Sequence, residues 1–345
     1  MFRRVFVYYN RGVQTGGPEA LHQLVVVLRE LGQEAYLVPI PGTDNVPRHP
    51  AYDHYGAPER PCVEDQVDCA VVVPEGAFSL LKSVKSAAKF CWWLSIDFSE
   101  HFFSERQVLI IPPARGVNDL KRFKHSVLKS VWAVKRNLID YASVTHLTQS
   151  QYAWSFLFTR LGVVSSMLSD FTPQSEFAVR DWGDHDRGPT VAFNPAKGGF
   201  WVDRIAKECP DVRFTAIRNM SRDQVVSTLC ASAVYLDMGH HPGKDRLPRE
   251  AASSGAVTVV ARRGAGAYWD DVPIPWEHKV SMTSPVGNAV EVIGRILANA
   301  TSAREKQSWY VDRIRSERVR FVTEVNAIFV AGELEFGSEG PPVHA

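Results

Sequence analysis

The sequence predicts an α/β protein made of two tandem, doubly wound domains with a cleft between them. Short apolar runs rich in β-branched residues alternate with stretches of helical periodicity along most of the chain. The alternation occurs once before Asp170, gives way to a polar segment, and starts again after Gly188. This pattern indicates parallel sheets covered by helices. The length, 345 residues, is enough for two such domains.

The first half opens as a strand–helix–strand unit. Residues 3–9 are β-branched and aromatic, and after the loop 10–17 apolar residues recur at helical spacing until Gly32. Pro18 stands at a first helical position, followed by Glu19 where the helix dipole favours an acid. Further strands are predicted at 34–39, 69–73, 90–95, 144–148 and 164–168, and further helices at 78–88, 126–140 and 151–161.

The second half repeats the alternation. Strands are predicted at 190–194, 212–217, 234–238 and 257–260, and helices at 201–209, 223–231, 248–254 and 286–300. We therefore divide the chain into a first domain at 1–172, a linker at 173–188, a second domain at 189–302, a long charged helix at 303–331 and a disordered tail at 332–345.

Composition narrows the class of protein. The net charge of +1 gives no overall basic field, so nucleic acid is not an expected partner. Five cysteines lie far apart without a CxxC pair, which favours reduced thiols over disulfides or a zinc site. No signal peptide and no apolar run near ~20 residues is present. We expect a cytoplasmic protein; peripheral contact with the inner face of the membrane stays open.

Charged residues gather between the strands predicted at 234–238 and 257–260. A polar loop between a strand's C-terminal end and a helix N-terminus is where open α/β sheets bind anions. Cationic side chains there can meet a diphosphate, and a carboxylate can accept hydrogen bonds from a ribose diol. Alternatively, Glu250 only favours the helix dipole. The charged residues in question are Lys244, Asp245, Arg246, Arg249 and Glu250.

Two other loops also carry polar candidates. In the NPAKGG segment, Lys197 offers a point charge to a phosphate and Gly198 lets the backbone approach a ligand, although Lys197 would also suit a solvated turn. Asp97 and His101 follow the strand at 90–95, where either could be a polar contact, a base or a surface residue.

Several alternatives are disfavoured by spacing. His240 and His241 are adjacent, so on an extended segment they point in opposite directions and cannot chelate together. The Gly264-x-Gly266 segment lacks the third glycine of a dinucleotide fingerprint. Because the sequence also has no DxD pair where a metal-dependent sugar transferase would hold one, we expect no protein-bound metal and no cofactor.

The tandem layout, the QTGGPE segment at 14–19 and the LPREAASSG segment at 247–255 resemble GT-B glycosyltransferases, above all the family 4-type retaining enzymes of bacterial polysaccharide assembly. The resemblance implies that Thr15, Gly16 and Gly17 approach the donor phosphates or the acceptor. It also implies that Lys197 binds the diphosphate and Glu250 the donor ribose. The long helix would cross back from the second domain to the first.

One position departs from the family pattern. The first of the family's two glutamates falls on Pro242 here, so the resemblance implies that Asp245 or Asp237 supplies the acid near the donor sugar. The catalytic candidates are then Asp97, His101 and Asp245. The donor-binding candidates are Lys197, Gly198, Arg246, Arg249 and Glu250.

The resemblance implies a retaining glycosyltransferase, and the absence of a DxD pair leads us to expect that it works without a metal. It would move a sugar from a nucleotide-sugar donor to a glycan, a lipid-linked compound or another acceptor. Two further hypotheses remain: a degenerate, non-catalytic subunit that binds a nucleotide or glycan and supports a partner enzyme, and an NAD-dependent enzyme. A homodimer is left open.

Overall fold

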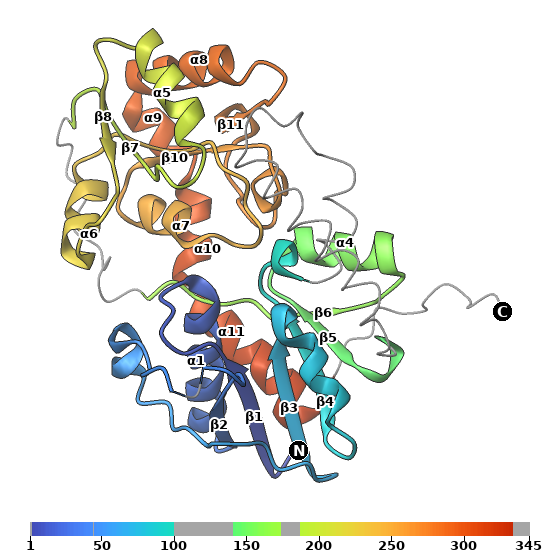
Figure 1. Cartoon of the computed structure of the whole chain (residues 1–345). Helices are drawn as coiled ribbons and strands as arrows, with labels where there is room; N and C mark the ends of the chain where they lie inside the picture. Colours follow the sequence, from blue (N-terminus) through green and yellow to red (C-terminus); the bar gives the residue numbers. More distant parts are fainter. Residues whose placement is uncertain (1, 44, 100–140, 174–186, 334–345) are drawn as a thin grey trace, which may run out of the picture. The chain divides into compact units, whose positions relative to one another are not determined.

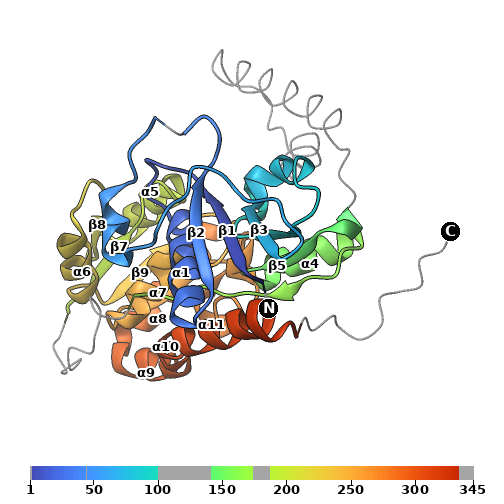
Figure 2. The same ribbon diagram turned by 90° about the horizontal axis from the view of Figure 1, so that it is seen from below.

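The chain forms two compact units, each built on a parallel sheet (Figures 1 and 2). The computed structural model describes residues 2–43, 45–99, 141–173 and 187–333. Unit 1 comprises residues up to Gln149, Ala153–Asp170 and the segment from Phe321 onward; unit 2 comprises Ser150–Tyr152 and Phe171–Arg320. The expected cleft between the domains stays a prediction, and the helix predicted at 126–140 and most of the expected linker and tail lie outside the described residues.

Unit 1 is a six-stranded parallel sheet with the strand order β2-β1-β3-β4-β5-β6. Its strands are β1 (Arg4–Tyr9), β2 (Glu34–Pro39), β3 (Cys69–Pro74), β4 (Ala88–Trp93), β5 (Thr145–Thr148) and β6 (Ser166–Met167). The other elements are α1 (Gly16–Glu30), η1 (Pro50–Tyr55), η2 (Glu75–Lys82), η3 (Ile96–Phe98), η4 (Tyr141–Ser143) and α4 (Gln151–Leu161). The central strand β3 is buried over Cys69–Val73, as expected for a strand covered on both faces.

The helix predicted at 78–88 is wrong. The chain instead forms the 3-10 segment η2, and Ala88 already begins β4. The Asp65 carboxylate accepts hydrogen bonds from the backbone N–H groups of Lys85, Ser86 and Ala87, at 2.7, 2.8 and 2.8 Å. These bonds hold the three residues in a turn, because amides bound to a side chain are not available to a helix.

Unit 2 is a five-stranded parallel sheet with the order β11-β10-β9-β7-β8. Its strands are β7 (Thr190–Phe193), β8 (Arg213–Ala216), β9 (Val234–Asp237), β10 (Val257–Ala261) and β11 (Lys279–Val280). Its helices and 3-10 turns are α5 (Gly199–Glu208), α6 (Arg222–Cys230), α7 (Arg246–Ser253), η5 (Ala265–Ala267), η6 (Trp276–His278), α8 (Pro285–Ala298), α9 (Ala300–Glu305) and α10 (Ser308–Arg315). One main core lies between the sheet and α5 and α8, where Val202, Ile205 and Ile293 are buried.

The single helix predicted at 303–331 is a series of shorter segments. Helix α11 (Glu317–Val325) and the π-helical segment η7 (Asn326–Ala331) follow α9 and α10. A contact with a distant strand accounts for the break after α9, because the Gln307 side chain bonds both backbone groups of Thr258 in β10, at 2.9 and 2.7 Å. From Phe321, within α11, the chain belongs to unit 1: Phe321 stacks on Trp92 with ring centroids 6.1 Å apart.

Candidate functional site

The strand order of the unit 2 sheet reverses between its two central strands, β7 and β9. The chain leaves β7 toward β8 on one side and later returns to β9 on the other side. At such a topological switch point the loops after the two central strands diverge, and open α/β sheets bind ligands in the crevice that results. Here those loops are residues 194–198 after β7 and residues 238–245 after β9.

Two glycines allow these loops to approach each other closely. Gly198 has a φ of +77°, and a Cβ atom there would lie 2.5 Å from the carbonyl carbon of Met238. A Cβ atom on Gly239 would lie 2.7 Å from the Cβ atom of Lys197 and 2.9 Å from Oδ1 of Asp237. Only residues without side chains fit at both places, so the glycine predicted to let the backbone approach a ligand, Gly198, packs against the neighbouring loop.

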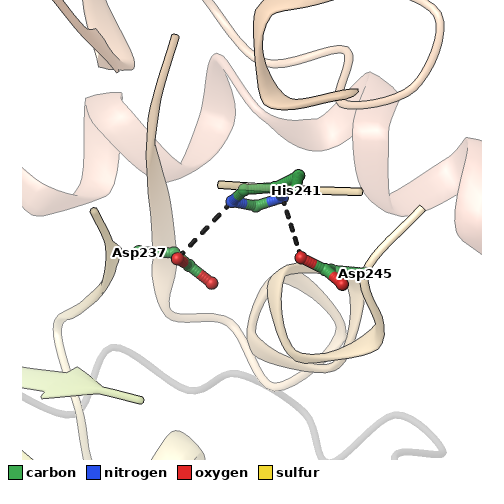
Figure 3. A group of neighbouring side chains, drawn as sticks. All are labelled: Asp237, His241 and Asp245. Atoms are coloured by element: carbon green, nitrogen blue, oxygen red, sulfur yellow. Dashed lines mark ion pairs between the residues drawn. The ribbon is translucent and has the colours of Figure 1, made fainter. Parts of the chain in front are cut away.

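The close approach assembles four charged side chains at the end of β9. The Lys197 ammonium donates a hydrogen bond to Oδ2 of Asp245. The His241 ring lies between two carboxylates, as Figure 3 shows, with Nδ1 3.3 Å from Oδ2 of Asp245 and Nε2 3.5 Å from Oδ1 of Asp237. Asp237 also accepts hydrogen bonds from the Gly239 N–H at 2.9 Å and the Tyr235 hydroxyl at 3.2 Å. We call Asp237, His241, Asp245 and Lys197 the charge cluster.

Burial makes the electrostatics of the cluster strong. Burial alone would lower the pKa of His241, but the Asp237 and Asp245 carboxylates outweigh it, and the pKa is raised. Burial would likewise raise the pKa of Asp237, yet the His241 imidazole, Lys197 and the Gly239 amide hold it below its ordinary value. Burial and the neighbouring carboxylates keep the pKa of Tyr235 well above its usual range, so its hydroxyl remains a donor.

The cluster also has the donor types of a metal site. Ligand atoms of Asp237, His241 and Asp245 lie within 4.8 Å of one another, and imidazole and carboxylate groups bind divalent ions such as zinc or manganese. In the structure, however, the Lys197 ammonium forms an ion pair with Asp245, where a metal cation would otherwise bind. The expectation that no metal is bound stays a prediction.

Glu250 lies in a second ionic group, beside the first on α7. Its side chain is 2% exposed, and its Oε1 atom is 2.9 Å from an Arg222 nitrogen and 3.3 Å from an Arg246 nitrogen. Arg222 begins α6 and was not a candidate in the sequence, because no local spacing connects it with Glu250. The structure thus brings the predicted donor-binding residues Arg246 and Glu250 together and adds a second guanidinium.

Arg249, the remaining donor-binding candidate, has a structural role. Its side chain is 1% exposed, and its guanidinium bonds Oε2 of Glu317 at 3.1 Å and the carbonyl oxygens of Lys244 and Asp245 at 3.1 and 3.3 Å. Glu317 also accepts hydrogen bonds from the Thr172 N–H and hydroxyl, at 2.9 and 3.0 Å. A buried guanidinium with these partners orders the start of α7.

A pocket of about 360 Å³ lies beside the Lys197 loop. It is lined by Phe193, Pro195, Gly199, Phe200, Asp203, Ala216 and Arg218. The Phe200 ring is 67% exposed and presents an aromatic surface. Because Pro195 and Gly199 flank Lys197 in the chain, the pocket adjoins the loop that carries its ammonium group. An aromatic wall with polar groups at the rim is typical of a site for a planar organic ligand.

In unit 1 the equivalent switch point lies between β1 and β3. The predicted loop residues Thr15, Gly16 and Gly17 follow β1 and begin α1, and the Tyr52 hydroxyl donates to the Thr15 carbonyl at 2.8 Å and accepts from its N–H at 2.9 Å. Asp97 lies in η3 after β4, on the same edge of the sheet, while His101 lies outside the described residues.

A buried acid at this edge of unit 1 was missed. Glu75 follows β3, is 5% exposed, and accepts hydrogen bonds from the backbone N–H groups of Leu94 and Ser95 at 2.9 and 3.2 Å. Burial raises the pKa of Glu75 to about 7. An acid directly after an apolar strand was the available signal.

Among the described residues, no helix combines the length and the apolar character needed to cross a membrane.

Known proteins resemble the chain in structure and not in sequence. No protein-family model and no curated protein matches it. Sucrose-phosphate synthase from Thermosynechococcus elongatus is similar over 95% of this chain and 98% of its own, with a TM-score of 0.66 and 12% identity. Anabaena HepE in complex with UDP-glucose is similar over 95% of this chain and 99% of its own, with a TM-score of 0.61 and 12% identity. A glycosyltransferase from Rickettsia africae is similar over 94% of this chain and 98% of its own, with a TM-score of 0.58 and 8% identity.

At these identities the likeness concerns the fold, and it extends over nearly the full length of both chains in each case. The predicted fold class is confirmed: the chain has the GT-B fold, with two Rossmann-like units, each on a parallel sheet.

Proposed function

We propose that the chain is a glycosyltransferase that binds its nucleotide-sugar donor on unit 2. One observation carries the proposal: two neighbouring ionic groups at the switch point of the unit 2 sheet contain three cationic side chains, and a pocket with an aromatic wall adjoins the Lys197 loop. Lys197 comes from the loop after β7, Arg246 begins α7 and Arg222 begins α6. The complex of HepE with UDP-glucose supports a nucleotide sugar as the ligand of this fold.

The proposed site divides the donor among these groups. The nucleobase would enter the pocket beside Phe200, and the diphosphate would meet Lys197, Arg246 and the N-terminal end of α7. Charge develops on the diphosphate as the sugar leaves, and fixed cations and amides stabilise that charge most where water is excluded. We propose that these groups act without a metal, with the Lys197 ammonium as the nearest cation.

Glu250 would contact the donor ribose, as the family resemblance implies. In the structure its Oε1 atom faces Arg222 and Arg246, so donor binding would bring at least one guanidinium toward the phosphates. The acceptor, a glycan or lipid-linked compound, would be handled by the edge of unit 1 that carries Thr15, Gly17 and Asp97. Retention of configuration, cytoplasmic location, peripheral membrane contact and a homodimer remain proposals from the sequence alone.

Thermal-shift measurements with UDP, GDP, TDP and CMP test donor binding directly. A ligand at 100 times its Kd stabilises the folded state by about 2.7 kcal/mol, and we expect this for one nucleotide. Lys197→Gln should remove most of the shift, whereas Lys207→Gln, an exposed lysine on α5, should not. If no nucleotide stabilises the protein, the proposal is wrong.

A second measurement separates an enzyme from a binding subunit. Asp245, proposed to supply the missing family acid, forms ion pairs with Lys197 and His241. Because a carboxylate engaged in this way is less available as a catalytic acid, the non-catalytic alternative also needs a test. Release of the nucleoside diphosphate from the matching nucleotide sugar should be followed with the isolated protein. Turnover supports the transferase; nucleotide binding without turnover, with and without glycan acceptors, supports the subunit.

A further inference from the structure

Arg222 occupies a position that its own helix does not favour. It is the first residue of α6, and a capping box fixes that helix start: the Ser221 hydroxyl accepts from the Gln224 N–H at 3.3 Å, and the Gln224 side chain accepts from the Ser221 N–H at 2.7 Å. The dipole of a helix disfavours a cation in its first turn. A partner outside α6 therefore accounts for the arginine, and that partner is Glu250 on α7.

Glu250 is a buried carboxylate with two cations on the same oxygen. Its side chain is 2% exposed, and Oε1 lies 2.9 Å from Nη1 of Arg222 and 3.3 Å from Nη2 of Arg246. Neither of these ion pairs uses Oε2. A buried carboxylate that loses its only counter-ion is strongly destabilising, because its charge is then out of water without compensation. With two guanidinium groups in place, one can leave while the other still compensates the charge.

The two guanidinium groups differ in their surroundings. Arg246 begins α7 and directly follows Asp245, which accepts the hydrogen bond from the Lys197 ammonium. Arg246 is thus next to the cation proposed for the diphosphate. Arg222 reaches Glu250 from another helix and is the nearer of the two to Oε1. When an anionic donor arrives, Arg246 is the side chain placed to turn toward it, and Arg222 is the one placed to stay.

We propose that Arg222 is a positioning residue for the donor: it stays on Glu250 when Arg246 turns to the diphosphate, and so it holds the carboxylate in place to accept hydrogen bonds from the ribose hydroxyls. The inference rests on the proposed function, because it concerns the same site. Arg222 itself would not touch the donor.

This arrangement predicts a preference for one class of sugar in the nucleotide. A carboxylate only accepts hydrogen bonds, so it binds the 2′-hydroxyl of ribose, whereas 2′-deoxyribose leaves a buried acceptor without its donor. The protein should therefore select ribonucleotides over 2′-deoxyribonucleotides, and Arg222 should be needed for that selection.

Calorimetry on the whole chain with UDP and 2′-deoxy-UDP, and with GDP and 2′-deoxy-GDP, tests the inference. For the pair that binds more tightly, we expect the wild-type protein to prefer the ribonucleotide on the order of tenfold, the effect of one hydrogen bond to a charged group. Arg222→Gln should weaken ribonucleotide binding on the order of tenfold and bring the preference close to one. Arg213→Gln, an exposed arginine at the first residue of β8 and so at the opposite end of that strand from the site, should leave both affinities unchanged.

A double-mutant cycle shows whether Arg222 acts through Glu250. Glu250→Ala removes the charge that needs a counter-ion and should by itself abolish the preference for ribose. Adding Arg222→Gln should then have no further effect on nucleotide affinity, because the contribution of Arg222 depends on the carboxylate that it contacts. Equal losses from Arg222→Gln in the presence and in the absence of Glu250 would overturn the inference.

Arg222→Lys keeps the inference testable when Arg222→Gln does not fold. The lysine retains the counter-charge that the buried carboxylate needs, but an ammonium group does not reproduce the fixed directions of the guanidinium N–H groups. We expect Arg222→Lys to fold and to lose most of the preference for ribose. A preference equal to that of the wild-type protein would refute the positioning role of the guanidinium.

The outcomes separate the inference from the proposed function. If the wild-type protein binds a nucleoside diphosphate but binds the 2′-deoxy form equally well, or if Arg222→Gln binds both forms like the wild type, the role of Arg222 is refuted while the donor site stands. If no nucleotide binds the wild-type protein, the donor site itself is refuted.

Discussion

Replacing Gly239 with alanine tests whether the two loops of unit 2 must touch. The added methyl group would lie 2.7 Å from the Lys197 Cβ atom, whereas ordinary contacts begin near 3.4 Å, so the loops must separate by about 0.7 Å. Both neighbours of the methyl group are held, Asp237 by Tyr235 and the Gly239 N–H, and the backbone of Lys197 by the turn. We expect a loss of about 1–3 kcal/mol in the free energy of unfolding, as for other overpacked interiors.

The functional effect of Gly239→Ala should exceed its effect on stability. Separation of the loops moves the Lys197 ammonium from Asp245, and displacements of this size in a charged site cost roughly tenfold or more. Urea denaturation gives the stability, and calorimetry with the bound nucleotide gives the affinity. Gly294→Ala is the matched control, because nothing lies within 4 Å of its Cβ position on α8 and the change should stabilise the helix by up to ~1 kcal/mol. Equal stability and affinity in Gly239→Ala and wild type would refute the reasoning.

Three further changes have defined outcomes. Glu317→Ala leaves the guanidinium of Arg249 buried without its carboxylate, and urea denaturation should show a loss of about 3–5 kcal/mol; a loss below 1 kcal/mol would show that the pair is not structurally important. Glu250→Ala should raise the donor KM by on the order of tenfold, and unchanged donor binding by calorimetry would contradict the ribose assignment. Burial raises the pKa of Glu75 from 4.5 to about 7, so the folded protein holds this proton more tightly than the unfolded chain. The stability that this proton contributes is complete below pH 4.5 and falls by roughly 3 kcal/mol as the pH rises to 7; the difference in stability between Glu75→Gln and wild type should therefore change across that range, and a constant difference would exclude the assignment.

Local pattern was sufficient to predict strands β1 to β10, but the two-residue strand β11 (Lys279–Val280) was missed. The strand predicted at 234–238 is β9 at Val234–Asp237, and that predicted at 190–194 is β7 at Thr190–Phe193. Buried parallel strands form continuous apolar runs bounded by glycine, proline or polar residues, and these are visible within a few positions of the sequence. The helix starts after β1, β7 and β9 were visible for the same reason.

Contacts between distant segments were not predictable from local pattern. Asp65, twenty positions earlier in the chain, binds the backbone N–H of Lys85 and so prevents a helix at 85–87. Gln307 interrupts the C-terminal helix because its side chain bonds the backbone of Thr258. In the site, Lys197 and Asp245 were both candidates, but their direct pairing depends on how closely two glycines let the loops approach. Distances of this kind are set by packing in three dimensions, and neither residue type nor sequence spacing reveals them.

The return of the chain to unit 1 has a consequence for biosynthesis. Phe329 and Phe321 complete the core beside Phe90 and Trp92, yet they follow all of unit 2 in the chain. Domains commonly fold in order of synthesis, from the N-terminus. Unit 1 emerges from the ribosome first, but its core aromatic residues stay exposed until the segment from Phe321 onward has been translated. We therefore expect nascent unit 1 to be the part of this protein that most needs a chaperone.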